Sequence, residues 1–509
     1  MFLKKLKSFL TANNFYWLLI LTLTSSFFGI LPLIIKPTTP FYIIDPGPAY
    51  VANALEFIQI KKIFIVDHPG TPLTVFLSIP IYVVKIIVKL TGVTDFSLWS
   101  LENFTLVYWL SIFSVWVVFV IGVFLIHLAI YRYFKSRLVN LFLFLILFLS
   151  PMFLRMQRII TPEVFGLFFT GIWLNFIVTY LRKKEKDYLV LASIIAGLSI
   201  SSKLTFLFVG FTTLVLSFFT KNKKVIQLTI GGILGGFILG TSVVIRKYPS
   251  IINWLWSLLT RTGRSGGGDF GFFELSNINQ NIIFWFGHYN IFLLLLLVTI
   301  IILIQKLDKK YLLVKSIFIS SFIGILIFSK YREIHYQAGN ILLVCIMITF
   351  LFNELKLRYK IFLLCLVSVF AIYFVRDDFI NERREISKSY NLQQFSDSLP
   401  KKSTLIWDSV APTRQYAIIR GRDWSEYFYV TQMDKIITNN WLLSYGEKLL
   451  IYDNYNVSAT IDLFCWDGMI LNKNNLSVVL EYKSRYKYKY RDIEGTDMIF
   501  VQQINCKND

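Results

Sequence analysis

Acidic and basic side chains gather in the polar segment that follows the first apolar stretch of the chain. The segment reads IIDPGPAYVANALEFIQIKKIFIVDHPGTPL and carries Asp45, Glu56, Asp67 and His68. Ionisable residues are costly inside or against a bilayer, so a cluster beside an apolar stretch is a candidate functional site. Pro-Gly-Pro fixes a turn directly after Asp45, which suits a positioned general base. The alternative is that Asp45 caps a helix expected over 49–60.

The other members of this cluster allow more than one chemistry. His68 titrates near neutral pH and can bind a phosphate or a metal ion, but it also fits a polar turn. Asp67 can be a metal ligand, the partner of a ligand, or a solvated loop acid. A divalent cation therefore stays open, and the sequence indicates no other cofactor.

Basic residues follow three later apolar stretches. Arg158 has the planar guanidinium that suits a phosphate, although it can also anchor a lipid headgroup. Lys203 lies alone in the turn ISSKLT, where a lysine must face the bundle interior or reach the interface. We expect Lys203, Arg332 and His335 to bind an anionic lipid phosphate. Glu163, in TPE, fits an ordinary helix start as well as a site.

Further site candidates are Arg261, Arg264 and Glu333. The two arginines belong to the glycine-rich run RTGRSGGGDFG, which lacks the Lys-Ser/Thr pair and the preceding strand of a P-loop. This run can be a mobile lid or a flexible linker. A second glycine-rich run, GGILGGFILG, has small residues at helical spacing and predicts close helix packing.

Composition places these residues in a membrane protein. The chain has 509 residues, of which 55% are hydrophobic and 16% charged, and its mean hydropathy is +0.58. We therefore predict a polytopic α-helical membrane protein; the short alternating strands of a membrane β-barrel are absent. The net charge of +21 lies in short clusters between apolar stretches. That pattern is typical of topology signals and argues against a nucleic-acid partner.

About eleven membrane spans fit the hydropathy pattern. They are expected near 15–35, 103–130, 138–154, 162–181, 188–203, 205–220, 225–245, 284–304, 312–329, 338–353 and 361–376. Basic clusters precede the first span and follow every second span, which predicts a cytoplasmic N-terminus and an extracytoplasmic C-terminus. Residues 71–90 are long enough to span, but counting them would reverse every later loop. We interpret them as an interfacial or re-entrant helix, so the candidate site residues converge on the outer face.

The tail has ordinary polarity and a different pattern. Short runs such as STLIWDS, KLLIYD, LSVVLEY and DMIFVQQ predict strands. We expect a transmembrane domain over 1–376 and a small extracytoplasmic α/β domain over 377–509. Cys465 and Cys506 can pair if the tail is extracytoplasmic.

Five motifs follow one another over about residues 15–376: an acidic residue in the first outer loop, HPG, R-x-x-TPE, GLSISSK and R-E-x-HY. Their order resembles the GT-C glycosyltransferases, and most nearly the bacterial branch of the dolichyl-phosphate-mannose-protein mannosyltransferases. The resemblance implies an inverting transfer of a sugar from a polyprenyl-phosphate carrier. Asp45 matches the catalytic aspartate of the family. Arg158, Lys203, Arg332 and His335 stand where the family binds the donor phosphate.

The expected partners are therefore a polyprenyl-phosphate-linked sugar, membrane lipid, and a lipid, glycan or protein that offers a hydroxyl. The expected location is a bacterial plasma membrane, with the site on its outer face. One departure concerns Pro46, which stands where many relatives carry a second acid; the resemblance then leaves Glu56 or Asp67 as the candidates for that acid. The rival functions are a transporter or flippase of an anionic lipid-linked sugar, a non-catalytic scaffold, and a glycan polymerase or ligase with a lipid-pyrophosphate donor.

Overall fold

The computed structural model describes most of the helical part of the chain and the strands of its tail. The described residues are 12–35, 47–61, 63, 70–261, 269–271, 295–300, 311–328, 334–397, 404–407, 440–445, 448–453, 456–462, 476–482, 488–490, 493–495 and 498–504. They divide into two compact units. The first unit comprises 1–35, 65–77 and 112–382, and the second comprises 36–64, 78–111 and 383–509.

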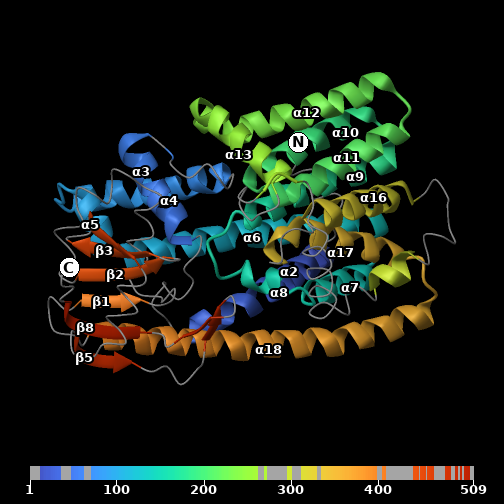
Figure 1. The fold of residues 1–509 in the computed structure, drawn as a ribbon. Coiled ribbons are helices and arrows are strands. Elements are labelled where there is room, and N and C mark those ends of the chain that lie inside the picture. Colours follow the sequence, from blue (N-terminus) through green and yellow to red (C-terminus); the bar gives the residue numbers. More distant parts are fainter. Residues whose placement is uncertain are drawn as a thin grey trace. The chain divides into compact units, whose positions relative to one another are not determined.

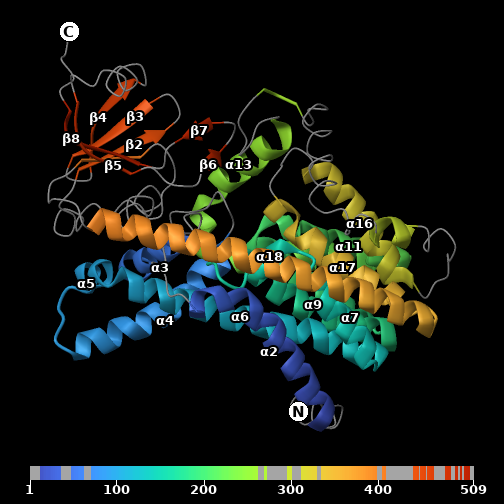
Figure 2. The same cartoon turned by 90° about the horizontal axis from the view of Figure 1, so that it is seen from below.

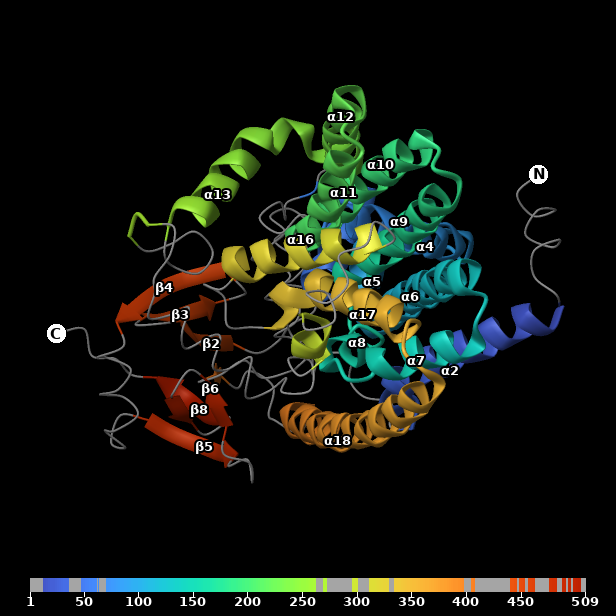
Figure 3. The ribbon, with the colours of Figure 1, turned by 90° about the vertical axis from the view of Figure 1, so that its right-hand side faces the viewer.

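The first unit is a helical bundle (Figure 1). Its elements are α2 (Ala12–Ile35), most of α6 (Phe104–Phe134), α7 (Arg137–Leu147), α8 (Pro151–Arg155), α9 (Glu163–Lys183), α10 (Lys186–Ser202), η1 (Leu204–Phe206), α11 (Leu207–Phe219), α12 (Lys223–Thr241), η2 (Ser242–Lys247), α13 (Tyr248–Thr260), α16 (Leu312–Phe328), η5 (Ile334–Gln337), α17 (Ala338–Phe352) and most of α18 (Leu357–Asp397). Helices α11, α16 and α17 pack in sequence against one another (Figure 3).

The helices confirm the predicted class of fold, a polytopic α-helical membrane protein. Among the described residues, six helices are long and apolar enough to cross a membrane, and shorter apolar helices accompany them. One of the six is α4 (Thr71–Leu90), which forms a continuous helix over the stretch that we interpret as interfacial. Its placement at the membrane surface and the orientation of the termini stay predictions.

Tight turns join several helices at basic residues. Lys135, Lys184 and Lys221 adopt left-handed backbone angles, with φ of 53°, 61° and 54°. They end α6, α9 and α11 within one or two residues of the next helix. The basic clusters that predict topology are therefore short connections at helix ends, where lysine and arginine complement the C-terminal end of the helix dipole.

Helices α10 and α12 pack backbone against backbone. A Cβ atom on Gly197 would lie 2.1 Å from the carbonyl oxygen of Ile233, and one on Gly236 would lie 2.0 Å from that of Ile194. Such distances leave room only for glycine, so the structure confirms that GGILGGFILG serves helix packing. By contrast, a Cβ on Gly231 or Gly235 of the same run meets nothing within 4 Å.

The second unit contains α3 (Gly47–Ile60), α5 (Phe96–Glu102) and the sheet of the tail. Six strands form one sheet in the order β4-β3-β2-β1-β8-β5, from Asn456–Asp462, Lys448–Asp453, Asn440–Tyr445, Thr404–Trp407, Met498–Ile504 and Leu476–Tyr482. The β1–β2 pair is parallel and the other pairs are antiparallel. Two shorter strands, β6 (Tyr488–Tyr490) and β7 (Ile493–Gly495), pair separately. All four runs predicted as strands contribute to this sheet.

Helix α18 crosses the expected domain boundary. It runs without interruption from Leu357 to Asp397, past residue 376, where the sequence turns polar (Figure 2). Its central part belongs to the first unit and supplies carboxylates to it, as described below. The division at 376 stays a prediction, but the polar start of the tail is helical and not part of the sheet.

Candidate functional site

Several helix ends of the first unit meet around η1. Helix α9 begins at Glu163 and packs along α10, which ends at Ser202. Lys203 leaves the helix with an extended backbone (φ −159°, ψ 137°), and η1 follows directly. The η1 turn contacts η5 and the start of α17, and Met156, Phe206 and Ala338 line a common small cavity. Residues far apart in the sequence thus share one end of the bundle.

Lys203 forms a buried ion pair at this end. Its ammonium contacts a carboxylate oxygen of Glu163, and the hydroxyl of Thr161 donates a hydrogen bond to the other oxygen. The Glu163 side chain is 1% exposed and that of Lys203 is 12% exposed. The local fold follows from the sequence, because Pro162 sets the helical start that places Glu163 in the first turn of α9. An ammonium has three donors, so this contact leaves Lys203 capacity for an anion.

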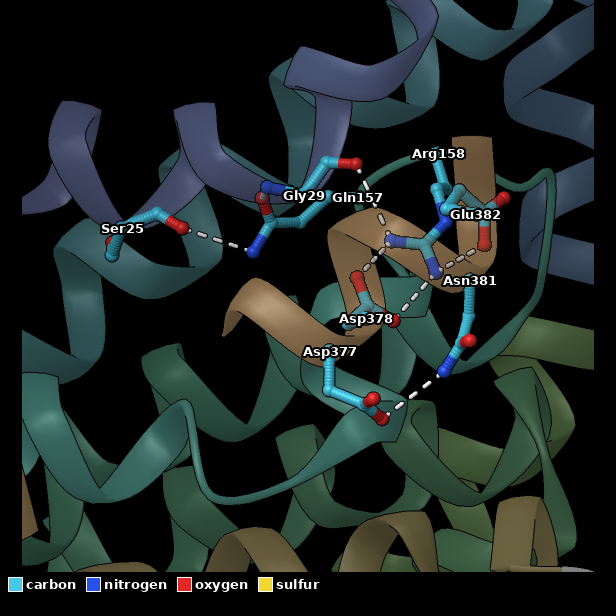
Figure 4. Close-up of polar contacts among 8 residues, drawn as sticks. All are labelled: Ser25, Gly29, Gln157, Arg158, Asp377, Asp378, Asn381 and Glu382. Carbon is cyan, nitrogen blue, oxygen red and sulfur yellow. Dashed lines mark hydrogen bonds and ion pairs between the residues drawn. The ribbon is translucent and has the colours of Figure 1, made fainter. Parts of the chain in front are cut away.

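Arg158 is held by two carboxylates of α18 (Figure 4). Its Nη1 and Nη2 atoms each donate to an oxygen of Asp378 at 2.8 Å, and Nη2 lies 2.7 Å from Glu382 Oε2. Asp378 and Glu382 are one helical turn apart, so their side chains share a face of α18. The Arg158 side chain is 3% exposed. The predicted role of this residue at a donor phosphate therefore competes with two internal carboxylates.

The neighbouring Gln157 ties the same segment to α2. Its Nε2 donates to the Ser25 carbonyl at 2.9 Å, and its Oε1 accepts the Gly29 N–H at 2.7 Å (Figure 4). These two backbone groups are the ones that an α-helix pairs with each other, so the side chain inserts into the hydrogen-bond ladder of α2. A Cβ on Gly29 would lie 2.4 Å from Gln157 Oε1, which explains why glycine stands there.

The predicted site residues fall into three groups. Arg158, Glu163 and Lys203 come together at one end of the first unit, and η5, the backbone of which carries His335, contacts η1 there. Glu56 is fully buried in α3 of the second unit, and Arg261 is exposed directly after α13. The remaining candidates lie outside the described residues; they are Asp45, Asp67, His68, Arg264, Arg332 and Glu333.

Sequence reasoning missed Gln157, Asp378 and Glu382. The acids of RDDFINERRE have helical spacing, but their partner Arg158 lies 220 residues from Asp378 in the chain. The part of the chain that the structure describes contains no group of three or more His, Cys, Asp or Glu side chains that could hold a metal ion. The divalent cation left open by the sequence therefore finds no ligand set among those residues.

Comparison with known proteins adds a fold likeness. No protein-family model matches the sequence, and no curated protein matches it. Among solved structures, ArnT from Cupriavidus metallidurans bound to undecaprenyl phosphate is similar with a TM-score of 0.55 at 11% identity. The apo state of the same protein gives 0.52 at 12% identity. Each comparison covers 95% of this chain and 97% of the other.

ArnT is a GT-C glycosyltransferase. At this level of identity the likeness shows the fold, and it gives no support to the mannosyltransferase branch that the motifs resemble. Together with the apolar helices, it identifies an integral membrane protein. The chain therefore has the polytopic GT-C fold seen in ArnT.

Proposed function

We propose that the protein is a glycosyltransferase that takes a sugar from a polyprenyl-phosphate carrier and transfers it, with inversion, to a hydroxyl acceptor at the outer membrane face. The observation that carries this proposal is the fold likeness over 95% of the chain to ArnT, a structure of which is bound to undecaprenyl phosphate. The acceptor is a lipid, a glycan or a protein. A donor with its tail in the bilayer accounts for the many apolar helices around the site.

Lys203 is the residue that we assign to the donor phosphate. The leaving group of the reaction is a lipid phosphate, the developing charge of which is stabilised by a fixed cation. Glu163, itself bound by the Thr161 hydroxyl, contacts the Lys203 ammonium at the junction of two helices without using all of its donors. His335 is proposed to assist, since η5 contacts η1 beside Lys203. Arg332, which lies outside the described residues, is proposed to assist on the family resemblance. Arg158 is a weaker candidate because Asp378 and Glu382 engage its guanidinium.

Asp45 is the residue that we assign as the general base. Inversion needs one carboxylate that acts as a base and deprotonates the acceptor hydroxyl. A double displacement needs a second positioned carboxylate that acts as the nucleophile. Glu56 and Asp67 are the alternative candidates for this role. His68 is an alternative ligand for the phosphate or for a metal ion. Arg261, Arg264, Glu163 and Glu333 are proposed as surrounding residues that orient the substrates.

Sugar transfer in proteoliposomes tests this proposal. Radiolabelled polyprenyl-phosphate and polyprenyl-pyrophosphate sugars are offered to wild type and to Asp45→Asn. We expect wild type to consume a monophosphate donor and the variant to lose activity by roughly 10²- to 10⁴-fold, the usual contribution of a general base. Donor binding is expected to persist in Asp45→Asn, which serves as the control for folding.

Each other outcome redirects the assignment. Equal turnover by both proteins removes Asp45 from the chemistry and directs attention to Glu56 and Asp67. Consumption of pyrophosphate donors alone identifies a polymerase or ligase. Labelled lipid that crosses the bilayer without sugar transfer identifies a flippase and overturns the proposal.

A further inference from the structure

Two buried amide side chains at the beginning of α17 have unsatisfied polar atoms. Gln337 is 6% exposed and Asn340 is 5% exposed. Asn340 Nδ2 donates to Gln337 Oε1 at 3.1 Å, but Gln337 Nε2 and Asn340 Oδ1 have no hydrogen-bond partner among the described residues. Turning both amides by 180° exchanges their nitrogen and oxygen atoms and still leaves one donor and one acceptor. Buried polar groups are nearly always paired, so this pair calls for a ligand.

The two amides belong to elements that contact η1, the turn directly after Lys203. Gln337 ends η5, Asn340 lies in the first turn of α17, and both elements contact η1. The contact is close, because a Cβ on the intervening Gly339 would lie 2.4 Å from the Thr205 carbonyl oxygen. The Thr205 hydroxyl, 2% exposed, likewise has no partner in the described part of the chain.

The chemistry of the pair selects a hydroxyl group. One donor beside one acceptor matches a group that both donates and accepts, as a hydroxyl does. A phosphate only accepts, so it would leave Asn340 Oδ1 unpaired, and a cation would leave Gln337 Nε2 unpaired. An isoprenoid tail has no polar group and would leave both atoms unpaired. Among the groups of a lipid-linked sugar, the sugar hydroxyls fit.

We propose that Gln337 and Asn340 bind hydroxyl groups of the sugar on the lipid donor, and so contribute to its recognition. This inference rests on the proposed function and deepens it. The sugar is bonded directly to the phosphate of such a donor, so a sugar subsite belongs next to the phosphate ligand. Lys203 is two residues from Thr205, and the Lys203 carbonyl accepts the N–H of Phe206 at 3.0 Å, which fixes both residues on one turn. The elements that carry the two amides, η5 and α17, contact that turn.

Binding of two lipids to two variants tests the sugar subsite. The lipids are undecaprenyl phosphate and the radiolabelled undecaprenyl-phosphate sugar that wild type consumes. The test variant is Gln337→Met/Asn340→Leu, which replaces both partners of the hydrogen bond by apolar side chains of similar size. Such a double replacement is expected to leave folding stability nearly unchanged.

We expect this variant to bind the sugar-bearing lipid roughly 10- to 100-fold more weakly, as lost hydrogen bonds to substrate predict. Its affinity for undecaprenyl phosphate is expected to equal that of wild type. The matched control is Thr349→Val on the same helix, because Thr349 is also buried but its hydroxyl donates to the Cys345 carbonyl at 2.7 Å. The control is expected to bind both lipids like wild type.

The remaining outcomes overturn the proposal in distinct ways. If the variant loses affinity for both lipids equally, the amides bind the phosphate or only stabilise the fold. Unchanged binding of both lipids means that the amides hold only water. A wild-type protein that binds and consumes neither lipid instead contradicts the proposed function itself, before any variant is compared.

Discussion

Arg158 and Lys203 both lie in buried ion pairs at one end of the first unit, yet the two side chains are held very differently. Two carboxylates surround Arg158, which is 3% exposed, and one of them binds it with both oxygens. In the described part of the chain, Lys203 contacts a single carboxylate, and its side chain is 12% exposed. The first arrangement is closed by protein groups, whereas the second keeps part of its cation accessible.

The charges sharpen this difference. Two carboxylates, Asp378 and Glu382, already engage the Arg158 guanidinium, so a phosphate would have to compete with them. Lys203 with Glu163 is neutral, and an ammonium with free donors can still accept an anion. Geometry adds to the contrast, because the guanidinium fork matches a carboxylate bidentately and links α18 to the segment before α9. We infer that Arg158 serves the fold and Lys203 serves the ligand.

The largest expected effect is on stability, from Arg158→Met. The change removes the cation that Asp378 binds with both oxygens and that Glu382 also contacts. Breaking a buried ion pair in this way costs about 3–5 kcal/mol. Thermal and denaturant unfolding of the protein in detergent measures the loss. The control is Arg158→Met/Asp378→Asn/Glu382→Gln, which also neutralises the two carboxylates and is expected to recover most of the stability. Intact stability with a loss of undecaprenyl phosphate binding would restore the phosphate role that the sequence suggests for Arg158.

A smaller effect, on ligand binding, is expected from Lys203→Met/Glu163→Gln. The pair of changes removes both charges together, so stability should stay within about 1 kcal/mol of wild type, as for other buried pairs replaced together. The affinity for undecaprenyl phosphate should fall roughly 10- to 100-fold, because a hydrogen bond from a charged group contributes about 1.5–3 kcal/mol. Isothermal or fluorescence titration of the lipid provides the measurement. If this variant bound undecaprenyl phosphate as tightly as wild type, Lys203 would not be a ligand of the donor phosphate.

The sequence could predict those features that local pattern determines. Length and hydropathy give α2, α9 and α16 nearly to the residue, because an apolar run of about 20 residues has few other stable states in a membrane. The alternation of basic clusters predicted that Arg158, Glu163 and Lys203 share one end. The structure brings them to the same end of the bundle.

Long-range pairing could not be predicted. The rise in polarity after residue 376 predicts a domain boundary there, yet α18 continues past it and its acids pair with Arg158. Nothing local connects groups 220 residues apart. The same holds for Gln157, whose amide completes hydrogen bonds of α2 at Ser25 and Gly29. A polar side chain in a mostly apolar chain signals a partner, but the identity of that partner depends on the packing of the helices.

The smallest expected effects come from exchanging the two kinds of cation. Arg158→Lys keeps the charge but loses the fork that binds both oxygens of Asp378, so we expect a loss of about 1–2 kcal/mol in stability and unchanged lipid affinity. Lys203→Arg keeps a cation at a site that needs only charge, and we expect undecaprenyl phosphate affinity within about threefold of wild type. Unfolding midpoints and lipid titrations on both variants compare the two sites directly. If Lys203→Arg lost stability and Arg158→Lys lost lipid affinity, the roles assigned to the two cations would have to be exchanged.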